Sequence, residues 1–296
     1  MTDVPQQPQP TDSIGDRSDG RIYVYTDAIT LAVDVAVATG RPLLVSGPTG
    51  TGKSSLARNA ALKRGWRYYE KTITSLTQAR DLLWEIDHLR RLNDAHAQRI
   101  DPDFTTYTRP GVLWWAMNHD TARTQAEIYG SAAKDPNIGA EHERAVVLLD
   151  EIDKADPDVP NNLLVPLGSF HFLIDESGRT VTLDPKNQPL IIITTNGERE
   201  LPAAFLRRCI ELHIPPADEQ RLLDIAEAHF EKPRADLSAT LDVIKKAKPD
   251  GFAEGALPSP AEFIDTIRAI ATLPSESQNK IAELIVWKQS QSAKVV

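Results

Sequence analysis

The residues best suited to chemistry form a glycine-rich loop within RPLLVSGPTGTGKSSLARNAALKRG, residues 41–65. Its spacing fits G-x-x-x-x-G-K-[ST], the pattern of a loop that cradles phosphates. Glycines let backbone N–H groups converge on phosphate oxygens, and the N-terminus of a following helix adds a favourable dipole. The pattern predicts a bound nucleotide, with Lys53 at the β and γ phosphates and Ser54 on Mg²⁺. The residues expected to bind the nucleotide are Gly47, Pro48, Thr49, Gly50, Thr51, Gly52, Lys53, Ser54 and Ser55.

Two adjacent carboxylates, Asp150 and Glu151, end the apolar run AVVLL. The carboxyl ends of strands in an open α/β sheet face the crevice that binds ligands. We expect Asp150 to hold Mg²⁺ through its water shell, and Glu151 to orient and polarise the attacking water. The pair also suits the start of a solvated turn, but its position about 95 residues after the phosphate loop favours catalysis. Asp153 is expected to be a solvated or capping acid.

Further polar candidates follow in IIITTNGERELPAAFLRRC. Asn196 ends an apolar run and is expected beside Glu151, where it would help to place the water. An Asn before Gly197 is also a common turn, so this assignment depends on the other motifs. Arg207 and Arg208 are either cations at the C-terminus of a helix or arginine fingers.

The elements that position these residues follow from apolar patterning. PLLVSG predicts a strand before the loop, and KSSLARNAALKRG a helix after it. DAITLAVDVAVATG predicts a helix capped by Asp27 and ended by Gly40. WRYYEKTIT predicts a strand. The uninterrupted runs AVVLLDEID and PLIIITTN predict strands buried on both faces of a parallel sheet.

Other segments complete the expected fold. Residues 75–98 predict one long amphipathic helix, and RPGVLWWAMN predicts another with Pro110 in its first turn. Residues 131–143 predict a loop. FHFLIDESGRTVTL alternates around Gly178, which indicates a β-hairpin within residues 170–183. The fold class is therefore α/β.

The chain divides by composition into three parts. Residues 1–20 are rich in Pro, Gln, Asp and Ser and predict a disordered tail. Residues 21–216 predict the α/β nucleotide-binding domain, and residues 217–296 a small all-helical domain, because the pattern becomes wholly helical. In this last part Ser259 and Glu262 form a capping box, with a proline at the first helical position.

Composition excludes several classes of protein. The net charge of −9 and the pI of about 5.3 argue against sequence-independent binding of nucleic acid, although a local basic pore stays compatible with them. The single cysteine, Cys209, fits a reducing compartment, and no apolar run approaches the length of a membrane span. We expect a cytoplasmic protein. The seven histidines show no metal-like spacing, and no G-x-S-x-G signature is present.

Taken together, these motifs resemble those of AAA+ ATPases. The order is GPTGTGKS, VVLLDEID, IIITTN, LPAAFLRRC and then a helical lid. RPGVLWWAM ahead of the acidic strand, and the hairpin before the Asn-ended strand, are similar to those of the MoxR-type, dynein-related branch. The resemblance covers roughly residues 22–290. It implies a P-loop core with a parallel sheet, followed by the lid.

The resemblance also implies roles. The glycine-rich loop would be Walker A, Asp150 and Glu151 the Walker B acids, and Asn196 sensor 1. Arg208 would be the finger that reaches the γ-phosphate of a neighbouring subunit, with Arg207 as the second choice. A finger in trans implies a ring, usually of six subunits, with ATP at each interface.

Two expectations from the family are weaker in this chain. Adenine would lie near residues 22–25, with Tyr25 as a contact. Where many lids place a sensor 2 arginine after a Ser-Pro step, this chain has Ala261. Arg268, two turns later, would either replace it or be an ordinary solvated arginine.

The function implied is Mg²⁺-dependent ATP hydrolysis by a ring that remodels, loads or activates a protein partner. Without a D-x-S-x-S motif in this chain, a von Willebrand A-type partner would be a separate protein. One alternative is a nucleotide-dependent switch with slow hydrolysis, and another is a GTP-driven translocation motor of the restriction type. Arg179 in the hairpin and the pair Trp114 and Trp115 are candidates to line a pore. The alternative for the two tryptophans is that they lie in the core.

Overall fold

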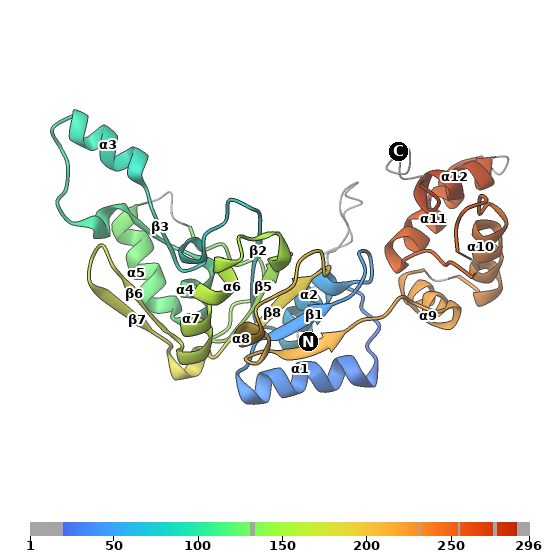
Figure 1. Cartoon of the computed structure of the whole chain (residues 1–296), viewed down its shortest axis with the longest axis horizontal. Coiled ribbons are helices and arrows are strands. Elements are labelled where there is room, and N and C mark those ends of the chain that lie inside the picture. Colours follow the sequence, from blue (N-terminus) through green and yellow to red (C-terminus); the bar gives the residue numbers. More distant parts are fainter. Residues whose placement is uncertain (1–19, 131–133, 231, 254, 275–276, 289–296) are drawn as a thin grey trace, which may run out of the picture.

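The computed structural model describes residues 20–130, 134–230, 232–253, 255–274 and 277–288. Within these residues, five parallel strands form one sheet in the order β2-β5-β8-β1-β9 (Figure 1). The apolar runs fill its central strands, whose residues are buried on both faces, as in other parallel sheets. The strands are β1 (Leu43–Ser46), β2 (Arg67–Thr72), β5 (Ala145–Asp150), β8 (Leu190–Thr195) and β9 (Ile210–His213).

Helices cover both faces of this sheet. Alternate residues of one strand point to opposite faces. In β5, Val146 and Leu148 pack with α1 (Asp27–Thr39) and α2 (Lys53–Arg64), whereas Val147 and Leu149 face the other core. That second core contains residues of α4 (Val112–Met117), α5 (His119–Tyr129), α6 (Asp158–Asn162), α7 (Leu164–Ser169) and α8 (Ala203–Leu206).

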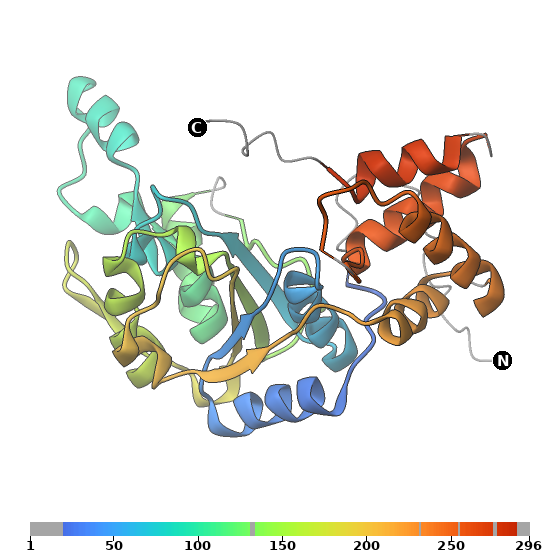
Figure 2. The same cartoon turned by 45° about the vertical axis from the view of Figure 1, so that its right-hand side comes forward.

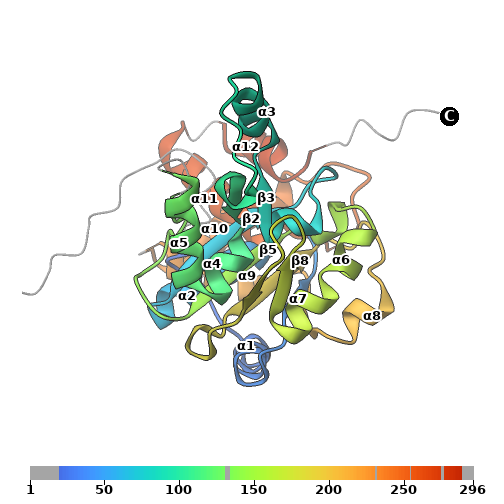
Figure 3. The same ribbon diagram turned by 90° about the vertical axis from the view of Figure 1, so that its left-hand side faces the viewer.

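The long helix predicted over residues 75–98 is wrong. The structure has a 3₁₀ turn η1 (Ala79–Leu82), strand β3 (Trp84–Ile86) and helix α3 (His88–His96) there. Three consecutive buried residues, Leu82, Leu83 and Trp84, cannot share one stripe of a helix. Asp87 instead begins α3 by accepting a hydrogen bond from the N–H of Arg90 at 2.8 Å. Helix α3 projects from the body (Figure 3).

The segment around Trp114 also differs from prediction. Pro110 lies in strand β4 (Thr108–Pro110), opposite Trp84 of β3, and Gly111 precedes α4. Trp114 and Trp115 are 0% and 3% exposed, so they belong to the core and do not line a pore in this chain. Helices α5, α6 and α7, together with η2 (Phe104–Tyr107), η3 (Ile152–Lys154) and η4 (Pro185–Asn187), were not predicted.

Other predicted elements are confirmed. The hairpin consists of β6 (His171–Ile174) and β7 (Arg179–Thr182), with Gly178 at φ 65°. Gly40 ends α1 at φ 68°, but the cap at its start is Thr26 and not Asp27, because the Thr26 hydroxyl accepts the N–H of Ile29. Residues 134–143 form the expected loop, whereas 131–133 lie outside the described residues.

Helices α9 (Glu219–His229), α10 (Arg234–Lys246), α11 (Pro260–Thr272) and α12 (Gln278–Ile285) follow the sheet. They surround their own apolar cluster, which includes Leu222, Phe263 and Trp287. Figure 2 shows them beside the end of the sheet that carries the phosphate loop. The capping box of Ser259 and Glu262 is present at α11. No helix in the described ranges is long and apolar enough to span a membrane.

The predicted tail falls almost wholly on residues 1–19, which lie outside the described residues. Gly20, its last residue, is buried against α2, where its carbonyl accepts a hydrogen bond from the side chain of Asn59 at 2.7 Å.

Candidate active site

The glycine-rich loop joins β1 to α2 at the carboxyl edge of the sheet. Gly47 has φ 146°, and a Cβ there would lie 2.2 Å from the carbonyl oxygen of Ile214. Gly50, at φ 81°, meets Ser259 in the same way at 2.6 Å. Among the described residues no side chain caps the start of α2. Its first N–H groups therefore remain available to an anion.

Lys53 lies in the first turn of α2 and is 7% exposed. Its Nζ donates to the carbonyl oxygens of Gly47 and Pro48 at 2.7 and 2.8 Å. Burial lowers the pKa of Lys53, while the neighbouring Asp150, Asp153 and Glu151 act in the opposite direction. The ammonium group thus sits at the base of the loop, within reach of phosphates that the loop would hold.

Ser54, Asp150 and Thr194 meet next to this lysine. The hydroxyl of Ser54 contacts both carboxylate oxygens of Asp150, at 2.8 and 3.0 Å. Thr194, from β8, donates its hydroxyl to the same carboxylate. Hydroxyl and carboxylate oxygens are the hard ligands that Mg²⁺ prefers, usually one or two from the protein beside phosphate oxygens of the substrate. Ser54 and Asp150 therefore fit such an ion.

Glu151 follows β5 with a left-handed backbone, φ 62° and ψ 50°. Backbone of this kind is unusual for glutamate and clusters at functional sites. Its N–H donates to the Thr194 hydroxyl at 2.9 Å. The carboxylate accepts from Asn196 Nδ2 at 3.4 Å and pairs with Lys154 Nζ at 2.7 Å. The structure thus brings Glu151 and Asn196 together, as the sequence predicts.

Asp153 is not the solvated or capping acid that the sequence suggests. It is 3% exposed, and one carboxylate oxygen accepts the backbone N–H groups of Asn196 and Glu198 at 3.1 and 3.0 Å. The 3₁₀ turn η3 folds it beneath the end of β8. The acidic side chain therefore fixes the loop that carries Asn196.

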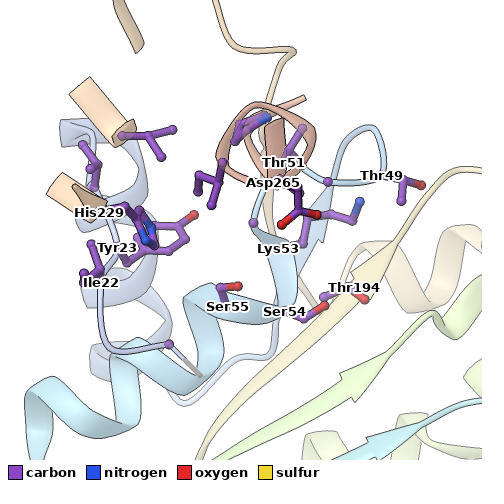
Figure 4. A pocket seen from close by; sticks show the side chains of 18 of the residues that line it. Ile22, Tyr23, Thr49, Thr51, Lys53, Ser54, Ser55, Thr194, His229 and Asp265 are labelled. Carbon is purple, nitrogen blue, oxygen red and sulfur yellow. The ribbon is translucent and has the colours of Figure 1, made fainter. Parts of the chain in front are cut away.

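A cavity of about 450 Å³ adjoins these groups (Figure 4). Asp150, Glu151, Thr194 and Asn196 line it. From the loop and α2 it is lined by Thr49, Gly50, Thr51, Gly52, Lys53, Ser54 and Ser55, whereas the predicted Gly47 and Pro48 contact Lys53 through their carbonyl groups.

The segment before α1 forms a second, more apolar part of the cavity. Ile22, Tyr23 and Val24 line it, and Figure 4 shows Ile22 and Tyr23 beside His229. Tyr25, the predicted adenine contact, is not among the residues that line the cavity. Its ring packs edge-on to Tyr23 and lies 4.7 Å from the ammonium group of Lys63.

Helices of the C-terminal part close the cavity. Arg221 of α9 lines it and donates to the carbonyl of Val24 at 3.0 Å. Helix α11 touches the loop directly, because the N–H of Ala261 donates to the Gly50 carbonyl at 3.3 Å. Asp265 and Arg268, further along α11, also line the cavity and form an ion pair at 3.7 Å.

Arg207 and Arg208 lie elsewhere. They precede β9, which runs parallel to β1 with Ile210 beside Leu43, whereas the phosphate loop begins at the other end of β1. A four-residue strand spans about 13 Å at roughly 3.3 Å per residue. The guanidinium group of Arg208 donates to the Leu164 carbonyl at 2.7 Å. Neither arginine lines the cavity of its own chain.

Sequence reasoning missed several site residues. Thr194 is signalled only by the polar end of the run IIITT, and a hydroxyl at a strand end is too common to be selected without the neighbouring strand. Lys154 was missed because the sequence around it, DEIDKADPD, is typical of a charged turn. Arg221 and Asp265 read as ordinary polar positions of amphipathic helices, because only the packing of α9 and α11 brings them to the loop.

This chain is similar to several known proteins. Residues 42–209 match the family described as AAA domain (dynein-related subfamily). The chaperone protein ClpB of Enterococcus faecalis (strain ATCC 700802 / V583) is 29% identical over 218 residues, which cover 72% of this chain and 20% of ClpB. This chain therefore spans about a fifth of that relative's length. A solved structure assigned as an ATPase from Cytophaga hutchinsonii aligns over 87% of this chain and 79% of its own, with a TM-score of 0.43 and 14% identity.

Proposed function

Because this chain belongs to the dynein-related subfamily of AAA domains, we propose that it hydrolyses ATP in an assembly of its own copies, of MoxR type, and uses the cycle to remodel or load a protein partner. The observation that carries the proposal is the contact of Ser54 with Asp150, beside Lys53 and opposite Glu151 and Asn196, on the wall of one cavity.

Each residue has a role that its position supports. Lys53 would exchange its carbonyl partners for phosphate oxygens. Ser54 and Asp150 would hold Mg²⁺, which neutralises phosphate charge when bound. Glu151 would accept the proton of the attacking water, and Asn196 would fix the orientation of that carboxylate. The apolar part of the cavity, near Tyr23, would receive the base.

The location of Arg207 and Arg208 supports the proposed assembly. Both are exposed and lie at the amino ends of the strands, away from the cavity of their own chain. If one of them stabilises the phosphate during hydrolysis, it would act on a neighbouring copy, and Arg208 is our first choice. A closed ring, of six subunits in this family, supplies every site with one such residue.

The lid offers one candidate to replace the missing sensor 2 residue. Ala261 sits at the phosphate loop, where an arginine would be within reach of the phosphates. We propose that Arg268, which lines the cavity from the same helix, contributes the lid's positive charge.

A protein partner is supported by two observations. ClpB, the curated relative, is named as a chaperone. The net charge of −9 disfavours a nucleic acid. A separate von Willebrand A-type protein is the partner class that we propose, in the cytoplasm.

One observation favours a second function. The Glu151 carboxylate is paired with Lys154 at 2.7 Å, a contact that would compete with its action on water. Together with Ala261 in place of a lid arginine, this pair suits a slow switch in which bound ATP orders a partner.

The direct test compares wild type with Glu151→Gln and Lys53→Ala, measuring nucleotide binding and phosphate release separately with ATP and with GTP. We expect Glu151→Gln to bind ATP and to lose hydrolysis by at least about a hundredfold, and Lys53→Ala to lose binding. Full turnover by Glu151→Gln, or turnover with GTP alone, would contradict the proposal.

A further inference from the structure

Arg41 makes an unusual set of contacts at the amino end of the sheet. Its guanidinium group donates to three consecutive carbonyl oxygens: Arg207 at 2.6 Å, Arg208 at 3.1 Å and Cys209 at 2.9 Å. These carbonyls belong to the turn that follows α8. Arg41 thereby supplies donors to three backbone carbonyls that lie just beyond Leu206, the last residue of α8.

The chemistry of the contact selects arginine. A guanidinium group is planar and carries five donors in a rigid fork, so it can bind adjacent carbonyls in one fixed arrangement. A lysine has one point charge on a flexible stem and cannot set the same geometry. The contact also places a third cation beside Arg207 and Arg208. The fork thus fixes the backbone of the turn through three hydrogen bonds.

Arg41 connects this turn to the strand that leads to the phosphate loop. Pro42 follows it, and the Pro42 carbonyl accepts the N–H of Ile210 at 2.8 Å. On the other side, the guanidinium group of Arg208 is held by the Leu164 carbonyl of α7. The backbone of Arg207 and Arg208 is therefore held by contacts with the residues just before β1. The side chain of Arg208 is held by α7.

We propose that Arg41 is a positioning residue for the arginine finger. It holds the Arg207–Arg208 turn so that the guanidinium group of Arg208 reaches ATP bound by a neighbouring copy. Arg41 then serves its neighbour's hydrolysis and not its own. This inference rests on the proposed function, since it requires an assembly in which fingers act in trans. A displacement of about 1 Å in such a group can cost a hundredfold in rate.

The test is a subunit-mixing experiment with Arg41→Met, which keeps the length of the side chain but removes the fork. Alone, Arg41→Met is expected to assemble and to bind ATP like wild type, yet to turn over at least tenfold more slowly. Arg123→Met is the matched control, because Arg123 is exposed and, within the described ranges, its ion pair is with Asp120 one turn away. It should keep full turnover. Arg41→Lys should fall between Arg41→Met and wild type.

Mixing separates a trans defect from a local one. Glu151→Gln has no hydrolysis of its own but offers an intact finger, so equal mixing with Arg41→Met should restore turnover at about half of the Arg41→Met sites. Mixing Arg41→Met with Arg208→Ala should restore nothing, because neither supplies a working finger.

A third mixture tests the underlying function. Arg208→Ala with Glu151→Gln should recover turnover if fingers act in trans. If Glu151→Gln restores turnover to Arg208→Ala but not to Arg41→Met, the positioning role of Arg41 is overturned and the finger in trans stands. Unchanged turnover of the unmixed Arg41→Met variant also overturns the role of Arg41. No recovery for Arg208→Ala overturns the finger in trans, and the positioning role with it.

Discussion

At the scale of single residues, the Thr194 hydroxyl connects the two acids of the site. It donates to the Asp150 carboxylate and accepts the N–H of Glu151, whose backbone is left-handed. One side chain thereby sets both the proposed Mg²⁺ ligand and the proposed base. Their relative position depends on a residue that carries no charge and that the sequence does not distinguish from its neighbours.

Thr194→Val tests this arrangement, since valine keeps the shape and removes the hydroxyl. The N–H of Glu151 would lose its partner, at a cost of about 1–3 kcal/mol for a buried donor. We expect ATP affinity to change by less than about threefold and turnover to fall at least about tenfold, which corresponds to about 1.4 kcal/mol. Steady-state kinetics with nucleotide titration checks this. The same exchange at exposed Thr180 in β7 is the control, and equal losses in both variants would contradict the role of Thr194.

At the scale of elements, the sequence identified segments whose pattern is local and uninterrupted. The strands β5 and β8, the loop-to-helix step at Lys53 and the hairpin around Gly178 each have a short-range signal. The region of η1, β3 and α3 was missed because its alternation of polar and apolar residues mimics a helical stripe. What breaks that stripe is the burial of Trp84 against β4 and Phe172, which are distant in sequence.

The capping box at α11 gives a prediction at this scale. The Glu262 carboxylate accepts both the N–H and the hydroxyl of Ser259, at 2.8 and 2.7 Å. Loss of such a cap typically costs about 0.5–2 kcal/mol. Because α11 also contacts the loop at Gly50, we expect Glu262→Ala to lower both the free energy of unfolding and the affinity for ATP. Glu262→Gln keeps an oxygen acceptor and should retain most of both. Urea denaturation measures the free energy of unfolding, and nucleotide titration measures the affinity for ATP. Equal losses of both in the two variants would count against the capping role.

At the scale of the whole molecule, the family match confirms the predicted membership of the dynein-related AAA branch, and the parallel sheet confirms the fold class. The motifs suffice for this because phosphate loop, acidic strand and Asn-ended strand must meet at one edge of a sheet. Arg268 was a candidate from the sequence, but the closing of the cavity by Arg221 and Asp265 was not predictable in the same way. It depends on how helices after β9 return to the loop, which no local pattern encodes.

Burial of weak acids makes the stability of the whole fold sensitive to alkali. Burial raises the pKa of Tyr23, Tyr68 and Tyr69 above the usual 10.0, and that of Cys209 from 9.0 to about 12. The folded chain therefore keeps protons that the unfolded chain releases. This contribution is fully present below about pH 9 and is lost as pH rises through 10 towards 12. Urea denaturation at several pH values should show a constant free energy of unfolding up to pH 9 and a fall above it. Tyr69→Phe removes one titrating group and should make the fall shallower; a profile that is unchanged by this variant would speak against the assignment.

The central claim is that catalysis requires an assembly, and its most direct measurement is ATP turnover per subunit against protein concentration, with the mass of the particles determined in the same samples. We predict that turnover of the wild type rises together with the assembled fraction, and that Arg208→Ala assembles and binds ATP but stays inactive at every concentration. A constant turnover per subunit across the transition, or full activity of the monomer, would contradict the account. A wild type that binds ATP and assembles with no turnover would instead favour the slow switch.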